Sequence, residues 1–421
     1  MIQSLSIGPG IRLRCIPDSR FKQGCLSLQL VRPMCRQEAS LNALLPAVLL
    51  RGTRQYPDLR AITLHLDDLY GASVGTLVRR VGDYQTTGLY CGFMEDRFAL
   101  EGDAILAPML EFVRQLLLEP VLENGCFQAD FVESEKKNLI ASIESQLNDK
   151  RAYAMEQMIR KMCREDSFGI PRLGEIADVE AITPQSLYAH YQKILRESRV
   201  ELLYVGTAPE ARVAELLQGL FRDVERNYVN LPEQTPLLTG PTSDTTKEMD
   251  VSQGKLCMGF VSPVTIREEG FVAMQLLNMI FGGGMTSKLF MEIRERKSLC
   301  YAIGSGFHGS KGLLTVSAGI DSGMKEAVQQ EVLNQLEACR KGEISQQEFT
   351  AAKEALRSSL LATQDSPGAL EGYYATAALS GLALTPDTYI EAVEKTTMEQ
   401  VVAAAKALTP HTVFFLKGVT A

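Results

Sequence analysis

The chain has 421 residues, of which 45% are hydrophobic and 22% are charged. This composition is typical of a folded protein with ample core, and it excludes disorder, collagen-like repeats and a disulfide scaffold. Lys and Arg number 43 against 51 Asp and Glu, a net charge of −8, so no positive field is present to hold a phosphate backbone and nucleic acid is not expected as a partner.

Strand and helix patterns alternate through the first half of the chain. Period-two alternation predicts strands at 11–16, 23–32, 72–80, 83–94 and 198–206. Helical spacing of apolar residues predicts helices at 40–51, 58–69, 102–118, 126–149, 151–163, 184–195 and 208–222. Ser40 is expected to cap the first of these helices.

A change of composition then separates two halves. Residues 226–247 hold three prolines among clustered Thr, Asn, Asp and Gly, which predicts a linker. After it, strands are expected at 248–262, 299–308, 312–320 and 411–417, and helices at 267–280, 286–295, 323–341 and 345–364. Both halves place a strand pair before a long amphipathic helix. This order predicts duplicated α+β domains at 1–225 and 248–421, each an antiparallel-rich sheet packed with helices.

The apolar stretches and the cysteines indicate a cytoplasmic protein. The N-terminal segment lacks the basic start and apolar stretch of a signal peptide. Apolar runs such as 41–50 are too short to span a bilayer, so no membrane partner is expected. The nine cysteines are odd in number and widely spaced, without a CxxC, and are expected to be reduced core residues.

The residues by themselves show no self-contained catalytic centre. The run Gly282, Gly283 and Gly284 follows an apolar helix and lacks the Lys-Ser/Thr of a P-loop, so it is interpreted as a helix end and a tight connection. The four histidines are isolated, and none forms the i, i+4 pair of a helical zinc site. No G-x-S-x-G nucleophile elbow is present either.

One segment resembles a known family. Residues 281–301, FGGGMTSKLFMEIRERKSLCY, resemble the glycine-rich segment of the M16 metallopeptidases, which include insulinase, pitrilysin and mitochondrial processing peptidase. The whole chain fits the M16B size of two homologous halves joined by a linker. The resemblance implies a LuxS/metallohydrolase-like α+β fold in both halves, and a substrate-binding role for Gly282, Gly283 and Gly284.

The resemblance also shows what the chain has lost. M16 enzymes hold zinc with an HxxEH helix motif, which aligns here with ALLPAVLLRGT. Ala43 and Ala47 stand at the two histidines, and Pro46 stands at the general-base glutamate. The third ligand lies seven residues after a glutamate that Glu135 matches, and Ser142 occupies that position. No metal is expected in this chain, and Pro46 is expected only in the first turn of a helix.

The second half keeps two family residues. In M16B enzymes, an arginine and a tyrosine contact the substrate near its scissile carbonyl, and the resemblance places Arg294 and Tyr301 there. A guanidinium offers a rigid fork of donors to peptide carbonyls, and one oxyanion donor is typically worth about 2.7–4 kcal/mol. The structural alternative is that Arg294 stabilises a helix C-terminus and Tyr301 begins a strand.

Together these features predict the non-catalytic subunit of a heterodimeric zinc peptidase. The partner would carry HxxEH and the zinc, this chain would supply Arg294 and Tyr301 in trans, and an extended peptide, with leader peptides among the candidates, would add to the edge strand at 72–80. This chain would hold no cofactor, and a homodimer is an alternative assembly when it is alone. The competing hypotheses are an inert scaffold or peptide-binding protein, as in the bc1 core subunits that resemble this family, and an enzyme that uses Cys300.

Overall fold

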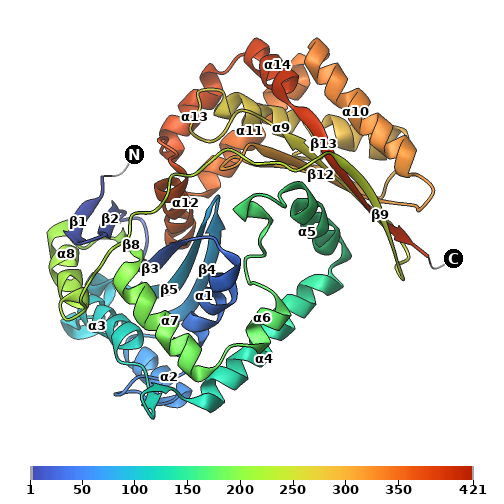
Figure 1. The fold of residues 1–421 in the computed structure, drawn as a ribbon. Coiled ribbons are helices and arrows are strands. Elements are labelled where there is room, and N and C mark those ends of the chain that lie inside the picture. The colour runs from blue at the N-terminus through green and yellow to red at the C-terminus, as the bar shows by residue number, and fades with distance from the viewer. Residues whose placement is uncertain (1–2, 420–421) are drawn as a thin grey trace. The chain divides into compact units, whose positions relative to one another are not determined.

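The computed structural model describes residues 3–419, which form two compact units (Figure 1). The first unit comprises Met1–Glu144, Ile170–Glu233 and Gln364–Leu379. The second unit comprises Ser145–Gly169, Gln234–Thr363 and Ser380–Ala421. The sequence-based halves are contiguous, whereas these units have exchanged residues 145–169 and 364–379.

The first unit contains a six-stranded sheet in the order β1-β2-β8-β3-β5-β4. β3 is apolar and buried because it lies in the interior of the sheet, antiparallel to both β5 and β8. β2 joins β8 in parallel, and β4 forms one edge, as expected for the strand at 72–80. The strands are β1 (Leu5–Gly8), β2 (Ile11–Pro17), β3 (Gln23–Pro33), β4 (Ser73–Val81), β5 (Tyr84–Met94) and β8 (Arg199–Gly206).

The second unit contains a five-stranded sheet in the order β11-β12-β10-β13-β9. β10 is antiparallel to β12 and β13, and β13 pairs with β9 in parallel. These strands therefore repeat the pairing of β4, β5, β3, β8 and β2, which confirms the expected duplication at the level of topology. The strands are β9 (Ser243–Met249), β10 (Gly254–Val261), β11 (Ala302–His308), β12 (Leu313–Ile320) and β13 (Thr409–Gly418).

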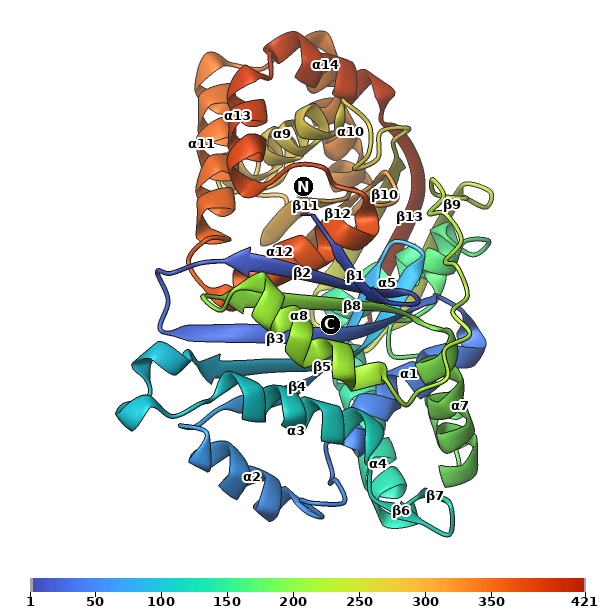
Figure 2. The same cartoon turned by 90° about the vertical axis from the view of Figure 1, so that its left-hand side faces the viewer.

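Helices cover the sheets, and Figure 2 shows α3 and α8 alongside the strands of the first unit. The helices up to residue 218 are α1 (Arg36–Leu49), α2 (Leu59–Asp68), α3 (Leu106–Leu118), α4 (Ala129–Asn148), α5 (Lys150–Met162), α6 (Ile176–Glu180), α7 (Pro184–Glu197) and α8 (Glu210–Gln218). Later helices are α9 (Phe271–Phe281), the π-helix η5 (Leu289–Arg296), α10 (Lys325–Lys341), α11 (Gln346–Ala362), α12 (Pro367–Ser380), α13 (Pro386–Lys395) and α14 (Met398–Ala407). Minor elements are β6 (Leu122–Glu123), β7 (Cys126–Phe127) and the 3₁₀ turns η1 (Asp96–Phe98), η2 (Leu100–Gly102), η3 (Ser167–Gly169) and η4 (Gly219–Phe221). Within residues 3–419, no helix has the length and apolar character needed to cross a bilayer.

Two of these helices explain why the units are not contiguous. α5 packs on β10 and β13, where Met158 and Met162 are fully buried in the core of the second unit. α12 supplies Leu370 and Ala375 to a buried cluster of the first unit that also contains residues of β2, β3 and β8. Burial of these apolar side chains stabilises the packing of α5 in the second unit and of α12 in the first. Helical spacing predicts α5 but does not say which sheet it covers, and it does not predict α12.

Three local expectations are corrected. α1 begins at Arg36 with Cys35 as its N-cap, so Ser40 lies inside the helix and does not cap it. β9 occupies the end of the expected linker, because its partner β13 supplies backbone hydrogen bonds to a polar strand without apolar alternation. The strand expected at 248–262 begins only at Gly254.

Candidate functional site

Three of the positions expected to have lost zinc chemistry line one cavity of the first unit. Ala43 and Ala47 project from α1, and Ser142 comes from α4. The cavity has a volume of about 360 Å³, and Glu135 of α4 and Thr76 of β4 also line it. The alignment with the zinc motif therefore describes residues that converge in space, although their side chains are a methyl group twice and a hydroxyl.

Pro46 lies inside α1, which corrects the expectation that it must stand in a first turn. A proline in a helix interior removes the hydrogen bond to the carbonyl four residues earlier. That carbonyl belongs to Asn42, and it instead accepts a hydrogen bond of 2.6 Å from the Thr87 hydroxyl of β5. The tertiary contact with β5 thus satisfies the group that Pro46 leaves without its helical partner.

The polar groups of the cavity do not fit a zinc ion. The Glu135 carboxylate accepts from Arg51 Nη1 at 3.2 Å and from Asn138 Nδ2 at 3.0 Å. The Ser142 hydroxyl donates to the Asn138 carbonyl at 2.8 Å. Structural and catalytic zinc sites need at least three protein ligands of nitrogen, sulfur or carboxylate oxygen. Among residues 3–419, no three His, Cys, Asp or Glu side chains come together as a metal site.

A buried polar network lies next to this cavity. Asn42 donates from Nδ2 to Gln85 Oε1 at 2.9 Å, and its Oδ1 lies 2.7 Å from His190 Nε2. Gln85 Nε2 donates to the carbonyls of Ala39 and Arg172. Burial lowers the pKa of His190 to about 4, so the neutral imidazole donates to Asn42. The sequence did not reveal this network, because Asn42, Gln85 and His190 lie far apart in the chain and on different elements.

The glycine run lies in the second unit. Gly282, Gly283 and Gly284 line a cavity of about 560 Å³. Gly282 is the C-cap of α9, as the interpretation of a helix end requires. Its carbonyl accepts from the backbone N–H of Ser305 in β11 at 2.8 Å. A Cβ at Gly282 would stand 2.6–2.8 Å from atoms of Ser305, so only glycine allows this approach.

Arg294 and Tyr301 are exposed on the same unit. Arg294 belongs to η5, and its guanidinium lies 4.7 Å from the ring centroid of Phe290, a residue that lines the glycine cavity. Tyr301 is 54% exposed, and its hydroxyl donates to Asp321 Oδ1 at 2.9 Å. This hydrogen bond raises the pKa of Tyr301, so the hydroxyl stays protonated at neutral pH.

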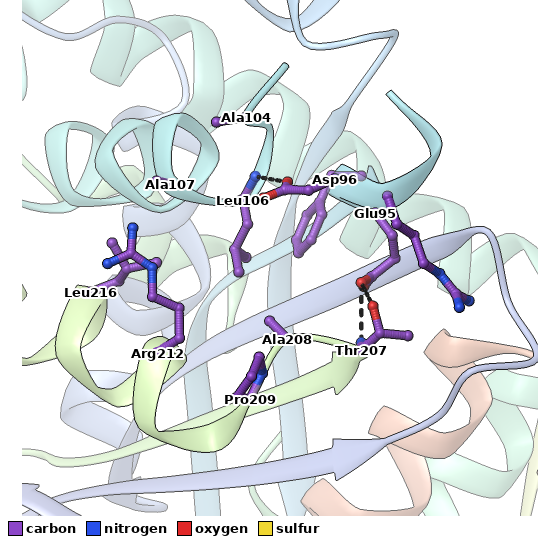
Figure 3. Close-up of a pocket in the computed structure, with 12 residues that line it drawn as sticks. Glu95, Asp96, Ala104, Leu106, Ala107, Thr207, Ala208, Pro209, Arg212 and Leu216 are labelled. Atoms are coloured by element: carbon purple, nitrogen blue, oxygen red, sulfur yellow. Dashed lines mark hydrogen bonds between the residues drawn. The ribbon is translucent and has the colours of Figure 1, made fainter. Parts of the chain in front are cut away.

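A second cavity of the first unit, of about 270 Å³, contains carboxylates with structural partners (Figure 3). Glu95 accepts from the Tyr204 hydroxyl and from the Thr207 N–H, each at 3.1 Å. Asp96 accepts from the backbone N–H groups of Ile105 and Leu106 at the start of α3. These contacts hold β5, β8 and α3 together and account for both carboxylates.

The cysteines behave as core residues. All nine are free, and seven are buried. Burial raises the pKa of the Cys300 thiol to about 11, away from the range in which a thiolate nucleophile forms at neutral pH. This environment argues against the hypothesis of a catalytic Cys300.

Comparisons with known proteins agree with these observations. Residues 181–356 match the family described as the peptidase M16 inactive domain. The chain is 28% identical, over 409 residues, to the probable inactive metalloprotease YmfF of Bacillus subtilis, covering 97% of this chain and 96% of that protein.

Two solved structures have the same fold. A conserved protein from Enterococcus faecalis V583 matches with a TM-score of 0.92 and 27% identity over 100% of this chain and 99% of the other. The peptidase M16 inactive domain from Pseudomonas fluorescens matches with a TM-score of 0.82 and 18% identity, over 100% of this chain and 99% of that one, and shows the fold alone. The expected two-domain α+β fold is thereby confirmed.

Proposed function

We propose that this chain, which resembles the M16 peptidase family but lacks its zinc ligands, is the non-catalytic subunit of a heterodimeric M16B peptidase. The partner would carry HxxEH and the zinc, and the complex would cleave peptides, with leader peptides among the candidate substrates. This chain would contribute Arg294 and Tyr301 to the partner's site. Nine free cysteines support a reducing compartment, so we place the complex in the cytoplasm.

The observation that carries this proposal is the exposure of the two side chains. Tyr301 is 54% exposed, and the Arg294 side chain is 43% exposed with only a loose ion pair, at 3.7 Å, to Glu295. Exposure alone is common for Arg and Tyr, but here it leaves accessible the two positions to which the resemblance of residues 281–301 assigns a substrate contact. In the cavity at Ala43 and Ala47, the Glu135 carboxylate is paired with Arg51 and Asn138, and the Ser142 hydroxyl donates to a backbone carbonyl.

The chemistry that these side chains can supply is polar stabilisation. The guanidinium of Arg294 can donate two hydrogen bonds to the carbonyls of an extended peptide and hold it in register. The Tyr301 hydroxyl can turn from Asp321 toward an oxygen that gains negative charge. Neither group abstracts a proton, so the chain alone is expected to cleave nothing.

The test is a reconstitution with an HxxEH-bearing protein from the same organism. Cleavage of a quenched peptide is measured for each protein alone and for the mixture, together with complex formation by size exclusion. The Tyr301→Phe chain is expected to lower turnover by about a hundredfold, since it removes one oxyanion donor, and Arg294→Ala is expected to raise KM strongly.

One exposed tyrosine and one exposed arginine outside the proposed site serve as matched controls. Tyr70→Phe removes another exposed hydroxyl that donates to a carboxylate, Asp103, at 2.6 Å, and Arg296→Ala removes an exposed arginine paired with Glu292. Both should leave turnover unchanged. If the mixture is equally active with Arg294→Ala and with Tyr301→Phe, the chain acts only as an inert scaffold. Stoichiometric zinc and cleavage by this chain alone would refute the proposal.

A further inference from the structure

The cavity beside the glycine run has a floor of small residues on one face of the second sheet. Gly304 pairs with Ser317, and Gly306 pairs with Thr315, between the antiparallel strands β11 and β12. Residues directly opposite each other in such a pair point to the same face, and all four line the cavity of about 560 Å³. α5 packs on β10 and β13 of this sheet, and its residue Arg151 lines the cavity as well.

The guanidinium of Arg151 is anchored at one nitrogen only. Its Nε donates to the hydroxyl of the buried Ser317 at 3.2 Å, which fixes one side of the planar group. In the part of the chain that the structure describes, the two Nη groups of Arg151 have no hydrogen-bond or ion-pair partner. A guanidinium can donate two parallel hydrogen bonds to the two oxygens of a carboxylate. Arg151 is therefore held in place with donors left for a ligand.

Helix stability does not account for the position of Arg151. The residue lies in the first turn of α5, where the positive end of the helix dipole disfavours a cation. Asp149 caps this turn by accepting from the backbone N–H groups of Arg151 and Ala152, at 3.0 and 3.1 Å. Among the described residues that line the cavity, the ionisable ones are Arg151 and His308, and none is Asp or Glu. The lining therefore favours a negatively charged ligand.

We propose that this cavity binds a carboxylate of a peptide, from an acidic side chain or from the C-terminus, through the Nη groups of Arg151. The volume is larger than a carboxylate needs and lies in the range that holds a small organic molecule. Met155 and Phe290 also line the cavity and suit an apolar residue next to the carboxylate. The inference deepens the proposed function, on which it rests for the peptide nature of the ligand, by naming carboxylate-bearing peptides as the substrate class.

The experiment uses the isolated full chain and three acetylated peptides of the form Ser-Leu-Xaa-Leu-Ser. The first has a central Glu and a C-terminal amide, the second has a central Gln and a free C-terminal carboxylate, and the third has Gln and the amide and is uncharged. Binding is measured by isothermal titration calorimetry at low salt. At least one carboxylate peptide is expected to bind about tenfold more tightly than the uncharged peptide. The tighter of the two identifies the source of the carboxylate.

Three variants, each checked for folding by circular dichroism, test the role of Arg151. Arg151→Gln should abolish the preference for a carboxylate, and Arg151→Lys, which keeps the charge without the planar fork, should retain only part of it. Arg160→Gln changes another arginine of α5, one that pairs with Glu156, and should leave the preference unchanged.

Three results would overturn the proposal: equal binding of the three peptides, an unchanged preference in Arg151→Gln, or no binding at millimolar peptide. Because this experiment needs no partner, its failure is distinguishable from a failure of the proposed function. The reconstitution with Arg294→Ala and Tyr301→Phe tests that function separately.

Discussion

The two sheets share one topology, but the cavities beside their edge strands have become different. β4 of the first unit borders a cavity lined by Ala43 and Ala47, whereas β11 of the second unit is bonded by the carbonyl of Gly282. The backbone pairing is held by buried apolar strands, and a change of ligand on a cavity wall leaves that core intact. Catalytic chemistry can therefore disappear from one unit without loss of the fold.

Unlike the cavities, the exchanged stretches of chain are held by the same kind of contact in both units. In the first unit, the fully buried Glu371 of α12 receives two hydrogen bonds from Arg79, at 2.9 and 2.7 Å. In the second unit, the fully buried Lys311 pairs with Asp166, which directly follows the segment of α5, at 3.0 Å. In both units the exchanged stretch of chain supplies the buried carboxylate, and a residue of the host unit supplies the cation.

The largest effect is expected from restoring the lost ligands. A chain with Ala43→His, Pro46→Glu, Ala47→His and Ser142→Glu regains two imidazoles and a carboxylate around one cavity and should bind one zinc ion per chain. Metal content after dialysis, measured by atomic emission, checks this. A variant with Ala43→His and Ala47→His alone has only two ligands and should retain far less. If the unmodified chain retained as much zinc as the fourfold variant, the cavity would already be a metal site, and this prediction would be wrong.

The buried pair of the second unit is the next test. Lys311→Met leaves Asp166 buried without its cation and should lower the free energy of unfolding by about 3–5 kcal/mol. Urea unfolding followed by circular dichroism measures this, since the chain has no tryptophan. Lys417→Met, which breaks an exposed pair with Glu248, should cost less than about 1 kcal/mol. Similar losses in the two variants would show that burial does not set the strength of these pairs.

The polar network of the first unit predicts a pH dependence. Burial lowers the pKa of His190 to about 4, below the unfolded value near 6.5. The unfolded chain therefore binds a proton first as the pH falls, and stability should decrease by about 3 kcal/mol between pH 6.5 and pH 4. Urea unfolding at several pH values measures the slope. His190→Gln should reduce the dependence of the free energy of unfolding on pH in this range. An unchanged slope would mean that other groups cause the dependence.

The smallest effect concerns the edge strand β4, whose Val78 carbonyl accepts a hydrogen bond from Arg172 Nη1 at 2.8 Å. Arg172→Ala frees the Val78 carbonyl to water and should change the global free energy of unfolding by less than about 1 kcal/mol. Hydrogen exchange should become faster in residues 77–81, because local opening is no longer opposed by the side chain. Exchange in β11, the corresponding edge strand of the second unit, serves as the internal reference. Unchanged exchange in β4 would mean that residues 170–172 do not restrain this edge.

Sequence patterns predicted most strands and the helices that present one apolar face. They missed α12, α13 and α14, between residues 367 and 407. α12 carries small and apolar residues around its whole circumference, so it lacks the stripe that marks an amphipathic helix. Sequence patterns also missed β9. Its polar residues do not alternate with apolar ones, because the strand is stabilised by backbone pairing with β13.

The sequence by itself determined the duplication, the family resemblance and the absence of zinc ligands, because these depend on residue identity and order along the chain. Only the tertiary structure decided which sheet α5 and α12 cover, how Thr87 compensates for Pro46, and that Ala43, Ala47 and Ser142 line one cavity beside the edge strand β4. These properties arise from contacts between residues far apart in the chain. Burial and hydrogen bonding select such contacts, and no local pattern records them.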